Sequence, residues 1–270
     1  MRIRCGYEID YVCGHPAPLL LMLSVRPERR GDLLTPETLD TTPAAPTRQY
    51  QDAFGNVCSR VDAPAGPIRF SSDFVIRDSG EPDAQAPGAV QHPVQDLPDE
   101  VLGFLLGSRY CETDRLSDTA WAQFGSTPEG WARVQAIVDY THRRIRFGYP
   151  DARATRTAYE GHQEQVGVCR DFAHLAVTLC RCMNIPARYV TGYLGDIGVE
   201  PVDAAMDFSA WFEVYLGGAW HAFDARHNHP RIGRIPLAYG RDATDVAIAT
   251  TFGDTRLTGF KVICEELPEG

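Results

Sequence analysis

The sequence has no stretch that approaches the roughly 20 consecutive apolar residues needed to span a bilayer. The longest apolar run near its start, LLLML at 19–23, is far shorter. The first residues, MRIRCGYEIDY, alternate like a strand and lack the apolar segment and cleavage site of a signal peptide. These absences predict a cytoplasmic protein with no membrane contact.

An excess of basic charge is also missing. The 270 residues include 26 Lys and Arg against 36 Asp and Glu, which gives a net charge of −10. This balance argues against nucleic acid or an anionic membrane surface as the main partner. The apolar fraction of 44% is that of an ordinary globular protein, and the length allows one large domain or two smaller ones.

The usual spacings of metal ligands are absent as well. Cys180 and Cys182 are spaced C-x-C, and His227 and His229 are spaced H-x-H, and neither is a typical zinc spacing. No acidic loop of the form D-x-D-x-D-G is present to bind calcium. The sequence therefore predicts no metal and no organic cofactor, and its eight cysteines are expected to be mostly buried thiols.

The first 80 residues have the pattern of strands and turns. Apolar side chains recur at every second position from Ile3 to Tyr11, and DAFGNV, starting at Asp52, has hairpin-turn chemistry. Residues 79–98 are rich in Pro, Gly and Asp. We predict an N-terminal antiparallel β-sandwich domain over 1–80, a linker over 81–98 and a second domain over 99–270.

The second domain begins with helical periodicity and ends with strands. Helices are predicted near 99–107, 115–124 and 128–145, and another begins within GVCRDFAHL, residues 167–175. Strands are predicted over 187–194 and over a hairpin whose two arms, 209–216 and 219–224, flank a Gly-Gly turn. The fold class is therefore α+β, with helices packed on an antiparallel sheet.

Cys169 is the candidate nucleophile. Gly167 lets the chain turn sharply before it, and the free N–H groups of the following helix favour a thiolate. The same N–H groups could hold the oxyanion of an acyl intermediate. Asp171 is placed to cap the helix rather than to act as a base. On this local pattern alone, a buried core cysteine is an equal alternative.

Four ordered motifs resemble the transglutaminase-like superfamily, a branch of the papain-like cysteine enzymes. They are GVCRDFAH from Gly167, IPARYVTGY from Ile185, AWFEVY from Ala210 and WHAFD from Trp220, and TAYE from Thr157 fits as well. The resemblance covers roughly 100–260, and the N-terminal strands are similar to the β-sandwich of many bacterial members. It implies acyl transfer through a thioester on Cys169, with Asp224 as the carboxylate of a thiol–imidazole–carboxylate triad.

The sequence departs from this pattern at Ser209, which stands where the resemblance implies a histidine. A serine hydroxyl has no pKa near neutrality and can neither act as a general base nor hold a thiolate by charge. Strand alternation places Ser209 on the same face as Asp224 and turns His221 to the opposite face.

Three other histidines are candidate replacements for the missing base. His227, three residues after Asp224, is the first, and His229 follows it. His174 lies about a turn and a half after Cys169 and is expected to point away from it. A polar loop with no catalytic role is the plain alternative for His227 and His229.

Three interpretations remain open from the sequence. The first is a cysteine acyl-transferase or peptidase that acts on glutamine or peptide amides of a protein or peptide substrate through Cys169. The second is a binding module that keeps the cleft and has lost its base. In the third, Ser209 orders a hydroxyl network around a thiol that needs little help from a base. The oligomeric state cannot be read from the sequence.

Overall fold

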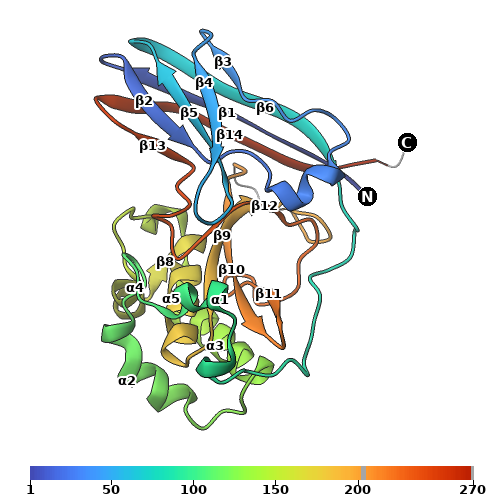
Figure 1. The fold of residues 1–270 in the computed structure, drawn as a ribbon, viewed down its shortest axis with the longest axis vertical. Helices are drawn as coiled ribbons and strands as arrows, with labels where there is room; N and C mark the ends of the chain where they lie inside the picture. Colours follow the sequence, from blue (N-terminus) through green and yellow to red (C-terminus); the bar gives the residue numbers. More distant parts are fainter. Residues whose placement is uncertain (202–204, 269–270) are drawn as a thin grey trace.

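The computed structural model describes residues 1–201 and 205–268 and has two parts, an upper and a lower one in the view of Figure 1. Strands from both ends of the chain form two sheets in the upper part of the view. Helices and a third four-stranded sheet form the lower part. The predicted α+β class, with helices on an antiparallel sheet and a sheet-rich N-terminal region, is confirmed.

The upper part, which we call the two-sheet region, is built from eight strands. One sheet has the order β14-β1-β6-β3 and the other β13-β2-β5-β4. Their bounds are β1 Arg2–Cys13, β2 Ala17–Leu21, β3 Asp40–Thr42, β4 Thr47–Gln51, β5 Val57–Ala63, β6 Gly66–Arg77, β13 Ala249–Thr251 and β14 Thr255–Leu267. Alternate residues of β1, among them Ile3, Cys5 and Ile9, are buried in one cluster with residues from both sheets.

The predicted hairpin turn DAFGNV joins β4 to β5. Oδ1 of Asp52 accepts the backbone N–H groups of Phe54 and Asn56 at 2.8 and 2.9 Å, and Gly55 adopts a positive φ of 74°. The Asn56 side chain then makes two 2.8 Å hydrogen bonds with the backbone of Tyr239 in the lower part. This turn therefore connects the two parts.

The C-terminal end of the range predicted as the second domain lies in the two-sheet region instead. β14 pairs with β1 from Arg2↔Leu267 to Cys13↔Thr255, and β13 pairs with β2. The sequence prediction assigned strands to domains by their order along the chain. In the structure, β14 pairs with β1, although the two strands lie at opposite ends of the sequence, and so covers an edge of β1 that would otherwise be exposed.

The lower part packs helices on a sheet of order β11-β10-β9-β12. Its strands are β9 Ala187–Tyr193, β10 Ser209–Leu216, β11 Ala219–Phe223 and β12 Ile235–Gly240, with a short parallel pair, β7 Arg146–Phe147 and β8 Val166–Gly167. Its helices are α1 Asp99–Leu102, α2 Thr113–Phe124, α3 Trp131–Arg144, α4 Ala158–Glu164 and α5 Cys169–Cys182. Short 3₁₀ turns lie at Pro27–Asp32, Val94–Asp96, Gly103–Leu105 and Tyr149–Asp151. The predicted β10–β11 hairpin is confirmed, with Leu216 opposite Ala219.

Helix α5 is buried on nearly all sides. Phe172 and Leu175 join the main cluster of the lower part, and polar residues of α5 are buried as well. Two of these polar side chains are hydrogen-bonded to backbone carbonyls: Arg181 donates to the carbonyl of Ala187, and Thr178 donates to that of His174. Because α5 is packed on nearly all sides, it holds Cys169, its first residue, in a fixed position.

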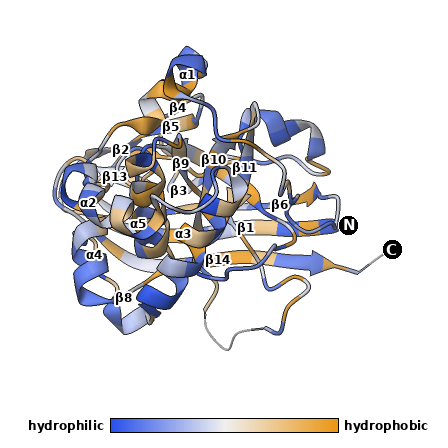
Figure 2. Ribbon diagram, turned by 90° about the horizontal axis from the view of Figure 1, so that it is seen from below, coloured by the Kyte–Doolittle hydropathy of each residue, from blue (hydrophilic) through white to orange (hydrophobic). Residues whose placement is uncertain are grey.

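The segment between the two parts runs down one side of the molecule (Figure 1) and is tied to it by Asp83. The Asp83 carboxylate accepts from Nε of Arg234 and from the backbone N–H of Arg231, each at 2.9 Å. In Figure 2, α4 is mainly hydrophilic, and the strands change colour along their length as alternation requires. In the part of the chain that the structure describes, no helix has the length and apolar character to cross a membrane.

Candidate active site

Cys169 is the first residue of α5, and only the N-cap residue Val168 separates it from the short strand β8. The structure gives a different reason for a glycine at position 167 than the sharp turn that the sequence predicted. This residue does not adopt a left-handed φ; instead, a Cβ there would lie 2.6 Å from the Asp171 carboxylate. Asp171 bends back and accepts the backbone N–H of Val168 at 2.9 Å, the capping role that the sequence predicted. The N–H groups of Cys169 and Arg170, the first two of α5, precede any intrahelical acceptor and remain available to an oxyanion, whereas that of Asp171 donates to the carbonyl of Val168.

The thiol of Cys169 is half-buried and holds its proton more tightly than a free cysteine does. Burial raises its pKa to about 11; Arg226 and a backbone hydrogen bond from Ala210 oppose this rise, whereas Asp207 and Asp224 add to it. The sequence argument, which weighed only the helix terminus, predicted a thiolate. Because burial outweighs that effect, attack by this sulfur requires a group that removes its proton.

Asp224 and His227 form a hydrogen-bonded pair in the loop after β11. His227 Nδ1 lies 2.8 Å from Asp224 Oδ2, while Asp224 Oδ1 accepts the backbone N–H groups of Arg226 and His227 at 3.0 and 3.1 Å. Burial tends to raise the pKa of Asp224, but the His227 hydrogen bond and the charge of Arg234 outweigh it and hold that pKa well below its usual range. The ionised carboxylate can only accept, so Nδ1 carries the proton and Nε2 is left as the acceptor.

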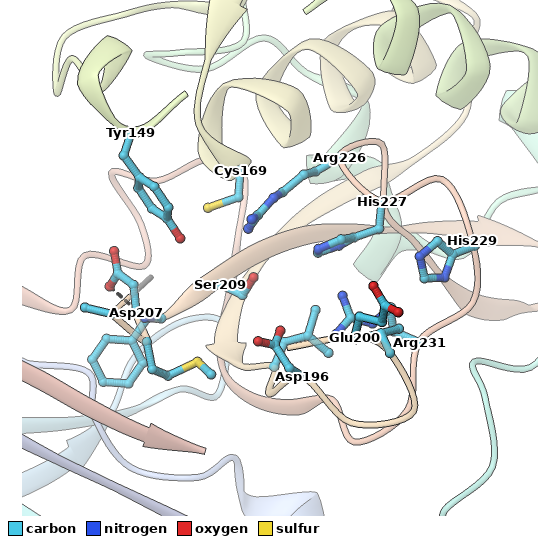
Figure 3. A pocket seen from close by; sticks show the side chains of 15 residues that line it. Tyr149, Cys169, Asp196, Glu200, Asp207, Ser209, Arg226, His227, His229 and Arg231 are labelled. Carbon is cyan, nitrogen blue, oxygen red and sulfur yellow. Dashed lines mark hydrogen bonds between the residues drawn. The ribbon is translucent and has the colours of Figure 1, made fainter. Parts of the chain in front are cut away.

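Cys169, Ser209 and His227 all line one cavity of about 200 Å³ (Figure 3). The Cys169 side chain enters from the start of α5, and the His227 ring points into the cavity towards Ser209. Asp224 lies behind His227 and is almost fully buried. The structure thus brings the four sequence-predicted site residues together, with nucleophile and imidazole facing the same space.

Ser209 is the first residue of β10 and lies opposite Gly192 of β9. A side chain at Gly192 would collide with the backbone of β12, because its Cβ would be 2.2 Å from the Ile235 carbonyl oxygen. The glycine therefore lets β12 approach β9 closely beside the cavity. This packing fixes the strand end from which the Ser209 hydroxyl faces Cys169.

The other histidines considered from the sequence have different environments. His174 is fully buried, stacked on Tyr110 and in tilted contact with Tyr189; burial lowers its pKa to about 3, and its Nε2 accepts the backbone N–H of Ala243. It is a packed histidine, as expected. His221 binds the Leu216 carbonyl on the far face of the hairpin. His229 lines the cavity but is exposed, with Nδ1 3.0 Å from the carbonyl oxygen of Pro230.

The sequence reasoning did not single out Arg226, Tyr149 or Asp207 as site residues, yet all three line the cavity with Cys169. Arg226 lies between Asp224 and His227 in the chain, and its guanidinium points towards the sulfur (Figure 3). The signal that could have found it is the DARH segment, in which one capping aspartate fixes the backbone of the next three residues. Tyr149 and Asp207 lie outside regular strands and helices, where periodicity gives no direction.

Among residues 1–201 and 205–268, no group of three or more His, Cys, Asp and Glu side chains is arranged to hold a metal ion. Cys182 and Cys180 belong to the buried cluster around α5, whereas His227 and His229 lie at the cavity. The C-x-C and H-x-H pairs therefore do not meet.

Comparisons with known proteins agree with this arrangement. A family model described as the transglutaminase-like superfamily matches residues 113–225. A solved structure from Cytophaga hutchinsonii, provisionally described as a cysteine protease, is 30% identical, with a TM-score of 0.86 and coverage of 100% of this chain and 92% of that chain. An uncharacterised protein of Mycobacterium leprae (strain TN) is 24% identical over 254 residues, 91% of each chain. With 30% identity to the first of these over nearly the whole of both chains, and with helix α5 and strands β9, β10 and β11 inside the matched segment, the protein belongs to the transglutaminase-like superfamily.

Proposed function

We propose that this protein is a cysteine acyl-transferase or peptidase that acts on glutamine or peptide amides through a thioester on Cys169. The observation that carries the proposal is the 2.8 Å contact between Asp224 and His227 Nδ1, which directs Nε2 into the cavity that Cys169 lines. His227 thereby takes the place of the histidine that the superfamily pattern puts at Ser209. Asp224 fixes the tautomer that a base requires.

The reaction follows from these positions. His227 Nε2 takes the thiol proton as the sulfur attacks the amide carbonyl, and the first N–H groups of α5 bind the oxyanion. The carbon–nitrogen bond then breaks, and the imidazolium returns the proton to the departing ammonia or amine. A water molecule or a primary amine, deprotonated by the same imidazole, attacks the thioester and releases the acyl group, which restores the thiol.

The high pKa of Cys169 supports a mechanism with a base. At a pKa of about 11, nearly all of the resting thiol is protonated at neutral pH. A hydroxyl network around Ser209 would have to act on a thiolate that is already present, so burial of the thiol favours His227 over that third interpretation.

Product analysis with a glutamine-containing peptide and an excess of a primary amine tests the proposal. We expect the amide to be consumed. Release of ammonia with incorporation of the amine identifies transfer, release without incorporation identifies hydrolysis of the side chain, and backbone cleavage identifies a peptidase. Binding of the peptide without consumption of any amide would contradict the proposal.

A binding module is the second candidate, and Ser209 together with the protonated thiol favours it. A binding module would bind the peptide without consuming any amide, and its affinity for the peptide would be unchanged when Cys169 is replaced. The remaining proposals concern the setting: a protein or peptide substrate, no nucleic acid or membrane partner, and a cytoplasmic location. Fractionation of cells with an antibody to the protein tests the location.

A further inference from the structure

The Arg226 guanidinium faces the nucleophile and has no part in the steps described above. It lines the cavity together with Cys169, Ser209 and His227, and in Figure 3 it lies on the side of the sulfur that faces His227. Its position is fixed twice. The backbone N–H of Arg226 donates to Asp224 Oδ1 at 3.0 Å, and its Cζ lies 3.8 Å from the centre of the Phe147 ring.

The surroundings of Arg226 leave its charge directed at the cavity. An aromatic face, rather than a carboxylate of the described residues, packs against the guanidinium. The neighbouring Arg234, by contrast, is held by Asp83 and Asp224. A guanidinium on an aromatic ring keeps its charge and its N–H donors free for a group beside it.

We propose that Arg226 supplies the positive charge beside the Cys169 sulfur that Ser209 cannot supply, so that charge stabilisation and proton transfer are divided between Arg226 and His227. This inference rests on the proposed function of Cys169 as nucleophile. When the thiol proton leaves for His227 Nε2, the thiolate is held by a cation that neither gains nor loses a proton, because arginine stays protonated throughout. An imidazole acting alone would have to serve both purposes.

Other charged and titratable groups act on the sulfur or line the cavity and set the background against which Arg226 acts. They are Asp207 before β10, Asp224, His227, His229 and Arg231 after β11, Tyr189 of β9, Asp196 and Glu200 after β9, and Tyr149 before α4. Asp207 and Asp224 oppose the thiolate, and Arg226 has the largest effect in the favourable direction. Arg170, although adjacent in sequence, donates to the carbonyls of Arg153 and Ala154.

The test is the rate at which neutral iodoacetamide alkylates Cys169, measured across pH 7–10 on its own peptide by mass spectrometry. A neutral reagent is chosen because Arg226 could bind an anionic one directly. An opposite charge nearby shifts a pKa by about one to three units, and a thiolate of higher pKa is intrinsically more nucleophilic. Combining the two effects, we expect Arg226→Gln to slow alkylation by about three- to thirtyfold at each pH.

Two variants separate charge from structure. Arg226→Lys keeps the cation and should retain most of the wild-type rate, while Arg170→Gln removes a neighbouring guanidinium that binds loop carbonyls and should leave the rate unchanged. Equal rates for Arg226→Gln and wild type would overturn the proposal. So would equal slowing by the Gln and Lys variants, which would show that the Arg226 side chain acts only through packing on Phe147. Thermal unfolding of each variant confirms that the fold is intact.

The experiment needs no substrate, so its failure can be distinguished from failure of the proposed function. If Arg226→Gln does not slow alkylation while turnover still depends fully on Cys169, only the role proposed for Arg226 is rejected. Turnover that survives Cys169→Ala, with the alkylation effect present, would reject the proposed function and leave a thiol that lies beside the Arg226 charge without a role in turnover.

Discussion

Replacing Cys169 with alanine should lower turnover of the glutamine-containing peptide by about 10⁴-fold or more, because Cys169 is the only thiol among the described residues that line the cavity. The affinity for the peptide should change little, since the thiol is one small group in a cavity of about 200 Å³. Initial rates of ammonia release and a binding titration measure the two quantities separately.

A second cysteine provides the matched control. Cys13 is buried at the end of β1 in the two-sheet region and does not line the cavity. Cys13→Ala should leave turnover unchanged and should lower stability slightly, as loss of a buried sulfur requires. Turnover that persists in Cys169→Ala, in a variant that unfolds at the wild-type temperature, would show that the nucleophile lies elsewhere.

The second large effect is expected at His227. His227→Asn should reduce kcat/KM by about 10²- to 10⁴-fold, the range for loss of a positioned general base. Asparagine can still donate to Asp224 but offers no basic nitrogen to the thiol, which is protonated at neutral pH. The Asp224 carboxylate keeps its hydrogen bonds to Arg234 and to backbone N–H groups, so the loop should remain folded.

His229→Asn is the control for the loop histidines. This residue lines the same cavity but is exposed and contacts the Pro230 carbonyl instead of Asp224. We expect its replacement to change kcat/KM less than about threefold, as for surface substitutions away from the reacting groups. The opposite result, a large loss of kcat/KM in His229→Asn and a small loss in His227→Asn, would identify His229 as the base.

Much of the fold could be predicted from the sequence because its signals are local. The Gly-Gly turn set the β10–β11 register, and DAFGNV gave the β4–β5 hairpin. The pairing of β14 with β1 could not be predicted, because strand pairing between residues 2 and 267 has no signature in either segment. The burial of helix α5 on nearly all sides could not be predicted either, because its buried Arg181 is hydrogen-bonded to the carbonyls of Leu106 and Arg241, which are distant in the sequence.

The site shows the same division. Alternation along β10 and β11 placed Ser209 and Asp224 on one face and excluded His221 as a candidate base. The short distance along the chain from Asp224 made His227 the first candidate base, and the two side chains are hydrogen-bonded. The sequence did not indicate that burial raises the pKa of the Cys169 thiol, since that burial depends on elements that meet only in the fold. Arg226 was missed for a related reason, because a loop after a strand has no period from which a side-chain direction can be read.

The most direct test of the central claim is the intact mass of the protein after brief reaction with an activated ester of a glutamine-type acyl group, quenched in acid. A covalent acyl adduct should appear on the Cys169 peptide, be absent in Cys169→Ala, and decay when a primary amine is added. No adduct on that peptide while the ester is consumed, or an adduct on another residue such as Ser209, would contradict a Cys169 thioester.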